Sequence, residues 1–127
     1  RKENTLLNLI ENDFELHTDE NILRFILRNI IGNAIKFTTT GTITIDAQKT
    51  EQSVVISIQD TGVGITKEVI EKIMTTSNKY TSLGTNNEKG TGLGLVFVKD
   101  FIYLLKGKMW VESEVNKGTT FYIELLN

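Results

Sequence analysis

The sequence predicts a two-layer α/β sandwich, in which helices cover one face of a mixed, largely antiparallel sheet. Residues 20–37 carry apolar side chains at helical spacing, whereas residues 42–47 and 53–59 alternate apolar and polar side chains, as half-buried strands do. The 127 residues, of which 39% are hydrophobic and 24% charged, suffice for one core and are too few for two. We therefore expect a single domain covering residues 1–127.

The composition also restricts the possible functions. Without cysteine, the chain offers no disulfide, thiolate metal site or cysteine nucleophile. The net charge is −2 and the basic residues are scattered, whereas a nucleic-acid surface needs a basic stripe. Apolar runs such as residues 101–105 are far shorter than the roughly 20 residues of a membrane span, and no signal-peptide pattern opens the chain. We expect no nucleic-acid partner and no direct membrane contact.

The N-terminal half contains the longest predicted element. A helix is expected at residues 20–37, and strands at residues 5–10, 14–18, 42–47 and 53–59. Asp19 suits the N-cap of the helix, and Thr38-Thr39-Thr40-Gly41 ends it. The two strands after the helix are joined by a polar turn and predict a hairpin, which delivers Asp60 to the C-terminal end of a strand.

The C-terminal half adds helices at residues 66–73 and 91–106 and strands at residues 108–113 and 119–125. Thr66 can cap the first helix, and the second begins inside a glycine cluster and ends before Gly107. Between these helices, residues 74–90 are polar, show no period, and are longer than most structureless loops. We interpret this segment as a lid over a ligand.

Three polar residues share one side of the long helix. At about 100° per residue, Asn33 lies about 40° to one side of Asn29 and Lys36 about 20° to the other. The stripe borders the apolar arc, and asparagine oxygens beside a lysine suit Mg²⁺ and its phosphates. Taken alone, the stripe is more simply a solvated polar face. The glycine clusters elsewhere in the chain favour a ligand site.

Two glycine clusters flank the predicted lid. Asp60-Thr61-Gly62-Val63-Gly64 follows a strand, and Gly90-Thr91-Gly92-Leu93-Gly94-Leu95 opens a helix. Alternating glycines at a helix N-terminus cost conformational entropy, which an approach of backbone N–H groups to phosphate would justify. Asp60 is either an ordinary turn carboxylate or the acceptor for a purine's exocyclic amine, which would favour adenine over guanine. The second cluster matches neither the P-loop nor the dinucleotide fingerprint. We interpret the region as a nucleotide site.

Together and in this order, the motifs resemble those of the ATP-binding catalytic domain of sensor histidine kinases. Their superfamily also contains gyrase, MutL and the heat-shock chaperone ATPases. Residues 29–38 match the family's N box, residues 60–65 its first glycine box, residues 90–95 its second, and residues 117–121 its closing Gly-Thr segment. The resemblance covers nearly the whole chain and implies the Bergerat ATP-binding fold.

The resemblance implies a role for each matching residue. Asn33 would ligate Mg²⁺, Asn29 would support the metal and the phosphates, and Lys36 would contact phosphate; these three form the implied catalytic set. Asp60 would accept the adenine amine. The other implied nucleotide contacts are Gly62, Gly64 and Ile65 in the first glycine box, Tyr80 and Lys89 in the lid, Gly90, Thr91, Gly92, Leu93, Gly94 and Leu95 in the second glycine box, and Thr119 and Thr120 behind the adenine.

The chain departs from the family pattern in two places. The family carries a Glu-Pro-Phe phenylalanine box between its glycine boxes, whereas residues 74–80 read Met-Thr-Thr-Ser-Asn-Lys-Tyr and the chain has no proline. Hydrolysing relatives place a glutamate at the position of Asn29 to activate water, and an asparagine cannot act as a base. The only histidine, His17, falls on a predicted strand and is interpreted as an exposed strand residue, not a phosphoacceptor.

The implied activity is that of a protein histidine kinase. The domain would hold ATP and Mg²⁺ and donate the γ-phosphoryl to a histidine on a dimerisation domain of the same parent protein, which this chain lacks. A response regulator would act downstream. Two alternatives stay open: a catalytically weak ATP-sensing scaffold, and an anti-sigma-factor-type serine kinase or ATPase of the same fold. We expect the domain in the cytoplasm, with its parent anchored in the inner membrane.

Overall fold

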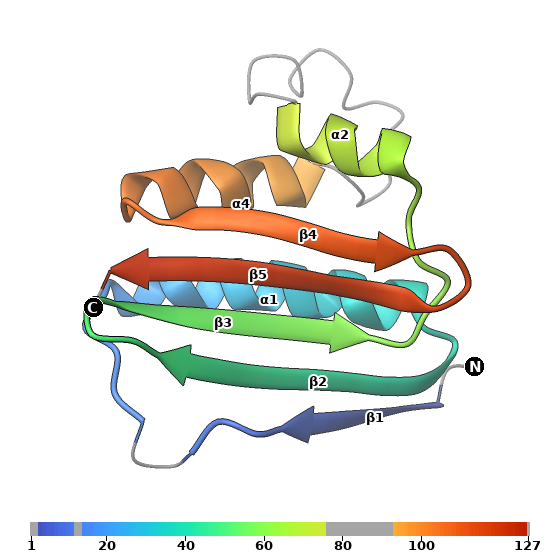
Figure 1. Cartoon of the computed structure of the whole chain (residues 1–127), viewed down its shortest axis with the longest axis horizontal. Helices are drawn as coiled ribbons and strands as arrows, with labels where there is room; N and C mark the ends of the chain where they lie inside the picture. The colour runs from blue at the N-terminus through green and yellow to red at the C-terminus, as the bar shows by residue number, and fades with distance from the viewer. Residues whose placement is uncertain (1–2, 12–13, 76–92, 127) are drawn as a thin grey trace.

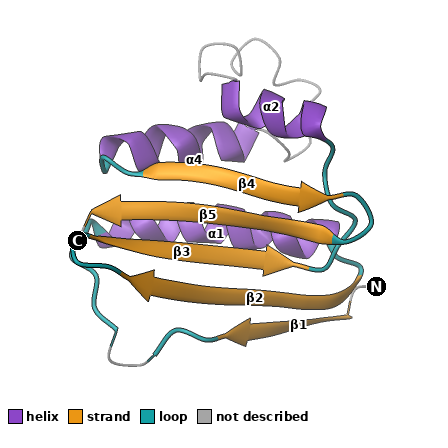
Figure 2. Ribbon diagram, in the orientation of Figure 1, coloured by secondary structure: helices purple, strands orange, loops and turns teal. Residues whose placement is uncertain are grey.

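The fold is a mixed five-stranded sheet with helices packed on one face (Figure 1). The computed structural model describes residues 3–11, 14–75 and 93–126. Its elements are β1 (Glu3–Asn8), α1 (Glu20–Phe37), β2 (Thr40–Lys49), β3 (Ser53–Asp60), α2 (Lys67–Thr75), α4 (Leu93–Leu104), β4 (Lys108–Glu114) and β5 (Gly118–Leu126). The strand order is β1-β2-β3-β5-β4, with β1 parallel to β2 and the other neighbours antiparallel. The predicted fold class is confirmed (Figure 2).

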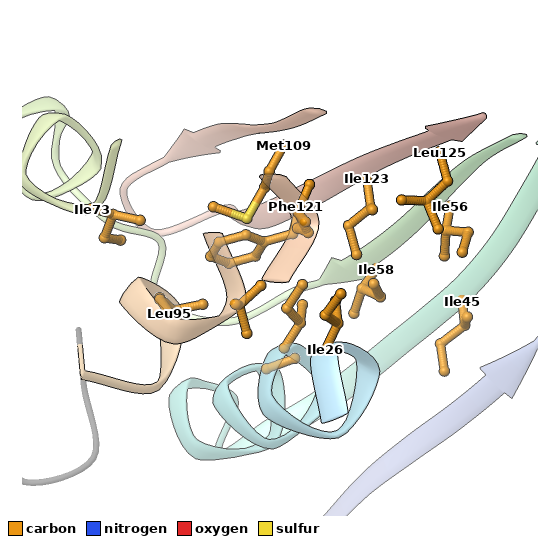
Figure 3. Close-up of a cluster of buried hydrophobic side chains, with 14 of the residues drawn as sticks. Ile26, Ile45, Ile56, Ile58, Ile73, Leu95, Met109, Phe121, Ile123 and Leu125 are labelled. Carbon is orange, nitrogen blue, oxygen red and sulfur yellow. The ribbon is translucent and has the colours of Figure 1, made fainter. Parts of the chain in front are cut away.

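Helix α1 has the predicted bounds. Its N-cap, Asp19, accepts a hydrogen bond on Oδ1 from the Ile22 amide at 3.0 Å. Ile26 and Ile30 are fully buried, and Figure 3 shows Ile26 directed toward Ile58 of the sheet. Burial of this one apolar stripe fixes the rotation of the helix about its axis.

Residues 14–18, predicted as a strand, have no regular secondary structure. They belong to the segment that leads from β1 to α1. This segment and α1 together form the crossover connection between the parallel strands β1 and β2. The alternation of Phe14 and Leu16 instead reflects two side chains that pack against the core from this connection. His17 is exposed there. β1 itself ends at Asn8, before the predicted end of the strand.

The hydrophobic core lies between the sheet and helices α1 and α4 (Figure 3). Ile56 and Ile58 from β3 and Ile123 from β5 supply its sheet side, because alternate residues of a strand point to the same face. Val98 of α4 is fully buried, and Ile73 of α2 joins the same cluster. The core therefore holds all three described helices on one face of the sheet.

The loop between β3 and α2 is fixed on two sides by backbone hydrogen bonds. The Val63 amide donates to the Phe37 carbonyl at the end of α1, at 3.2 Å. The Val63 carbonyl accepts from the Asn116 amide in the turn between β4 and β5, at 2.7 Å. The loop is thereby held between the helix layer and the sheet.

The two glycines of the first glycine cluster have no room for a side chain. A Cβ on Gly62 would lie 2.2 Å from the Phe37 carbonyl oxygen, and a Cβ on Gly64 would lie 2.3 Å from the Glu114 carbonyl oxygen. Gly64 also has a φ of 77°, a conformation that side chains disfavour. Both glycines are therefore required by close approaches within the domain itself.

Gly64→Ala should destabilise the domain by more than about 1 kcal/mol, because alanine is strained at positive φ and its Cβ would meet a backbone carbonyl. Gly32→Ala is the matched control, since a Cβ at this helical position meets nothing within 4 Å. It should stabilise the domain by up to about 1 kcal/mol through helix propensity. Urea unfolding measures both changes, and a Gly64→Ala variant as stable as the parent would contradict the packing argument.

Candidate functional site

The carboxylate of Asp60 lies at the C-terminal end of β3, on the side of the sheet that faces the helices. The residue is only 5% exposed. Its Oδ1 accepts two backbone hydrogen bonds, from Gly62 at 2.9 Å and from Thr119 at 3.2 Å. Thr119 lies opposite Asp60 in the register of β3 and β5. The carboxylate is thus held in one orientation by the loop on one side and the neighbouring strand on the other.

Burial raises the pKa of the Asp60 carboxyl, and the N–H groups of Gly62 and Thr119 oppose this rise. Between the ordinary pKa of 3.8 and the raised one, the folded state binds more protons than the unfolded state. The stability of the fold therefore decreases as the pH rises through this interval, and the cost is absent only below it. A buried acid that lowers stability at neutral pH is typical of a functional group.

A pair of hydroxyls supports the strand side of this carboxylate. The Thr119 and Ser113 hydroxyl oxygens lie 2.7 Å apart. The Ser113 hydroxyl donates to the Gly118 carbonyl at the start of β5 and accepts from the Ile65 amide at 2.8 Å, which links the loop after the first glycine cluster to β4. Ser113 was not among the predicted site residues. Its position in the core-facing row of β4 after Met109, where a hydroxyl is unusual, was the available signal.

The structure does not bring Thr120 into this cluster. Adjacent residues of a strand point to opposite faces of a sheet. Thr119 and Phe121 are buried on the helix side, so the Thr120 side chain lies on the outer face together with Tyr122. Of the two threonines predicted behind the adenine, only Thr119 shares a site with Asp60.

The polar stripe of α1 lies beside the buried stripe of the same helix. Asn33 is only 7% exposed, Asn29 is half-buried and Lys36 is exposed. Within the described part of the chain, the Asn33 side chain makes no hydrogen bond. Buried amides are normally paired, so this one is left for water or a ligand.

Helix α4 approaches α1 at Asn29. The Asn29 amide nitrogen donates to the Phe25 carbonyl at 2.9 Å, and its Oδ1 faces α4, where a Cβ on Gly94 would lie 2.5 Å from it. The rings of Phe25 and Phe101 pack edge to face with centroids 5.0 Å apart. The described end of the second glycine cluster is therefore in contact with the asparagine stripe.

Part of the predicted site falls outside the described residues. These predicted contacts are Tyr80, Lys89, Gly90, Thr91 and Gly92, and residues 76–90 of the predicted lid fall outside with them. Met74 and Thr75, predicted as the start of the lid, are the last residues of α2. Leu93 begins α4, and Leu95 is 4% exposed in the core, so a ligand can reach only its backbone.

The described site residues extend along one side of α1. The loop after Asp60 contacts Phe37 at the C-terminal end of the helix, and Asn33 and Asn29 lie one and two turns earlier. With a rise of 1.5 Å per residue, these positions are about 6 Å and 12 Å from Phe37 along the axis. A ligand that contacts both ends must be elongated, with a hydrogen-bond donor at the end that meets the Asp60 carboxylate.

Known sequences are similar to most of this chain. Residues 18–127 match the family model described as histidine kinase-, DNA gyrase B-, and HSP90-like ATPase. The chain is 39% identical over 124 residues to the autoinducer 2 sensor kinase/phosphatase LuxQ of Vibrio vulnificus, and 34% identical over 121 residues to the sensor histidine kinase WalK of Bacillus subtilis. Each match covers 93% of this chain but only 14% and 20% of those proteins, respectively.

Solved structures are similar over almost all of the chain. The nucleotide-free catalytic domain of the histidine kinase ThkA has a TM-score of 0.79 at 28% identity, over 97% of this chain and 78% of that one. Full-length ShkA in complex with AMPPNP has a TM-score of 0.78 at 28% identity, over 96% of this chain and 25% of that one.

Proposed function

This chain belongs to the family of histidine kinase-, DNA gyrase B-, and HSP90-like ATPases and is an ATP-binding catalytic domain of the sensor histidine kinase type. From this premise we propose the following function. The domain binds ATP with Mg²⁺ and donates the γ-phosphoryl group to a histidine on a separate dimerisation domain. The chain spans only 14% of LuxQ, so the activity of the whole protein is part of this proposal. The observation that carries it is the buried Asp60 carboxylate at one end of a stripe that holds the Asn33 amide, which has no hydrogen-bond partner within residues 3–11, 14–75 and 93–126.

The Asp60 carboxylate supports adenine recognition. Both of its backbone hydrogen bonds use Oδ1, which leaves Oδ2 as the acceptor for a ligand. The exocyclic amine of adenine can donate to this oxygen, whereas guanine would present a carbonyl oxygen there and repel it. We assign Gly62, Gly64, Ile65 and Thr119 to the same end of the nucleotide, since Gly62 and Thr119 donate to the carboxylate and Gly64 and Ile65 follow in the same loop.

The amides of α1 fit a magnesium ion. Mg²⁺ prefers oxygen ligands, and Asn33 offers a buried amide without a hydrogen-bond partner among the described residues. We assign Asn33 as the metal ligand, Asn29 to the metal and phosphates, and Lys36 to phosphate. When bound, the ion would neutralise charge on the transferred phosphoryl group.

The residues of this chain position ATP and do not attack it. Asn29 cannot take a proton, so no base stands where hydrolysing relatives carry a glutamate. His17 lies in the exposed connection before α1 and is not assigned as the phosphoacceptor. The site would instead hold the γ-phosphoryl group open to an imidazole from the dimerisation domain, and catalysis would come from orientation and charge neutralisation.

The proposal also covers the location of the domain and its downstream partner. Within residues 3–11, 14–75 and 93–126, no helix is long and apolar enough to cross a membrane. We place the domain in the cytoplasm, where ATP is supplied, within a parent protein anchored in the inner membrane. A response regulator would then receive the phosphoryl group from the histidine.

Asp60→Asn should lower the affinity for ATP roughly ten- to a hundredfold, because losing a charged hydrogen bond costs on the order of 1.5–3 kcal/mol. Asparagine can still accept both backbone hydrogen bonds, so the variant should fold. Calorimetry with ATP and GTP measures the effect, and the unchanged domain should prefer ATP. Asp46→Asn, which alters an acid on β2 away from the site, is the control. Unchanged ATP affinity in folded Asp60→Asn would remove Asp60 from the adenine site.

Asn33→Ala should weaken ATP binding more in the presence of Mg²⁺ than in EDTA, because the variant loses an oxygen ligand only when the ion is bound. Titrations of the same protein under both conditions give the comparison without a second variant. An equal loss of affinity in Mg²⁺ and in EDTA would exclude Asn33 as the metal ligand.

The isolated domain should neither label itself with γ-phosphate nor hydrolyse ATP at an appreciable rate. Addition of the histidine-bearing dimerisation domain of its parent should give acid-labile phosphate on that domain, slowly, because a bimolecular encounter lacks the effective concentration of a linked domain. Binding without transfer would indicate an ATP-sensing scaffold, and acid-stable phosphate on serine would indicate a serine kinase. Acid-labile phosphate on His17 would contradict the assigned role of the site.

A further inference from the structure

Lys99 of α4 donates hydrogen bonds to the C-terminal end of α2. Its Nζ donates to the carbonyl oxygens of Ile73 at 2.9 Å and Met74 at 2.5 Å. These carbonyls belong to the last turn of α2, where no later amide of the helix can pair with them. A cation is favoured at this end of a helix by the aligned peptide dipoles. The two helices are therefore joined by a charged side chain in addition to apolar packing.

The environment of Lys99 is partly desolvated. Burial lowers the pKa of its ammonium group, and the neighbouring Asp100 carboxylate opposes this shift. Ile73 and Val98, on either side of this contact, both belong to the buried core. The lysine contact between α2 and α4 therefore lies at the edge of the core, where Lys99 is only partly buried.

The same helix touches the nucleotide site through its first turn. Gly94 lies so close to α1 that a Cβ there would be 2.5 Å from the Asn29 Oδ1. Phe101, on the other side of Lys99 in the sequence, packs its ring on Phe25 of α1. Figure 1 shows α2 beside the beginning of α4. Helix α4 is therefore held by α1 on one side and by α2, through Lys99, on the other.

We propose that Lys99 is a positioning residue of the nucleotide site, which fixes the end of α2 to α4 and so keeps the first turn of α4 against Asn29. The inference rests on the proposed function, because it concerns the end of the site that is assigned to phosphate. With Lys99 in place, the phosphates meet backbone amides of α4 and the Asn29 side chain already at their working separation. Without it, binding must also order two helices, which reduces affinity.

Lys99→Met tests this role, because methionine keeps an unbranched apolar stem and removes the donors. Affinity for a non-hydrolysable ATP analogue with Mg²⁺ should fall about five- to tenfold, whereas affinity for adenosine, which has no phosphate, should stay within about twofold. Lys72→Met removes an exposed lysine from the same last turn of α2 and should change neither affinity. Lys99→Arg should restore most of the affinity for the analogue, since arginine can donate to both carbonyls.

Amide hydrogen exchange of the nucleotide-free domain gives a second readout. Exchange in α2 and in the first turns of α4 should be faster in Lys99→Met than in Lys72→Met. If Lys99→Met weakens both ligands equally, or neither, while wild-type binding is normal, Lys99 is not a positioning residue. If the wild-type domain binds neither ligand, the proposed function fails, and this role of Lys99 fails with it.

Discussion

Burial of one apolar stripe of α1 against the centre of the sheet decides how the rest of the molecule is arranged. Ile26 and Ile30 are fully buried and Ala34 nearly so, and rotation of the helix would return them to water. The positions of the polar residues at the edges of this stripe are set by the same burial. Asn33 lies at the border of the core and Asn29 faces α4 because of apolar contacts that neither of them makes. The amides proposed for the metal are thus positioned by the hydrophobic effect.

Asp60 shows the opposite balance. Its burial works against stability at neutral pH, and two backbone N–H groups only partly offset this cost. Those N–H groups come from the loop after β3 and from β5, so the acid also ties together two segments that are distant in the sequence. One end of the site is therefore held by apolar packing of a helix. The other end is held by hydrogen bonds to an acid whose burial lowers the stability of the fold at neutral pH.

Local patterns predicted the elements whose partners are close in sequence. The period of α1 and its Asp19 cap gave the helix bounds, and the hairpin of β2 and β3 followed from alternation and a polar turn. The alternation of Phe14 and Leu16 predicted a strand wrongly, because packing from an irregular connection produces the same pattern.

The features of the site that the sequence did not reveal depend on pairing between distant segments. Ser113 supports the site only because β4 pairs with β5 opposite Thr119. Thr120 was placed beside Thr119 by their adjacency in a motif, whereas the pleat of β5 separates their side chains. Lys99 reaches carbonyls that no helical period or glycine motif points to. Each of these needs the tertiary arrangement before its role can be seen.

Gly62 and Gly64 serve the fold before they serve any ligand. The loop passes between the end of α1 and the turn that joins β4 to β5, and only glycine fits at these two points. Selection for folding alone would therefore retain the two glycines of the Asp-x-Gly-x-Gly signature in a descendant that had stopped binding ATP. The Asn33 amide makes no hydrogen bond to the described residues that would support the fold in the same way. In a pseudoenzyme derived from this domain, substitution would be expected at the asparagine well before it reached the glycines.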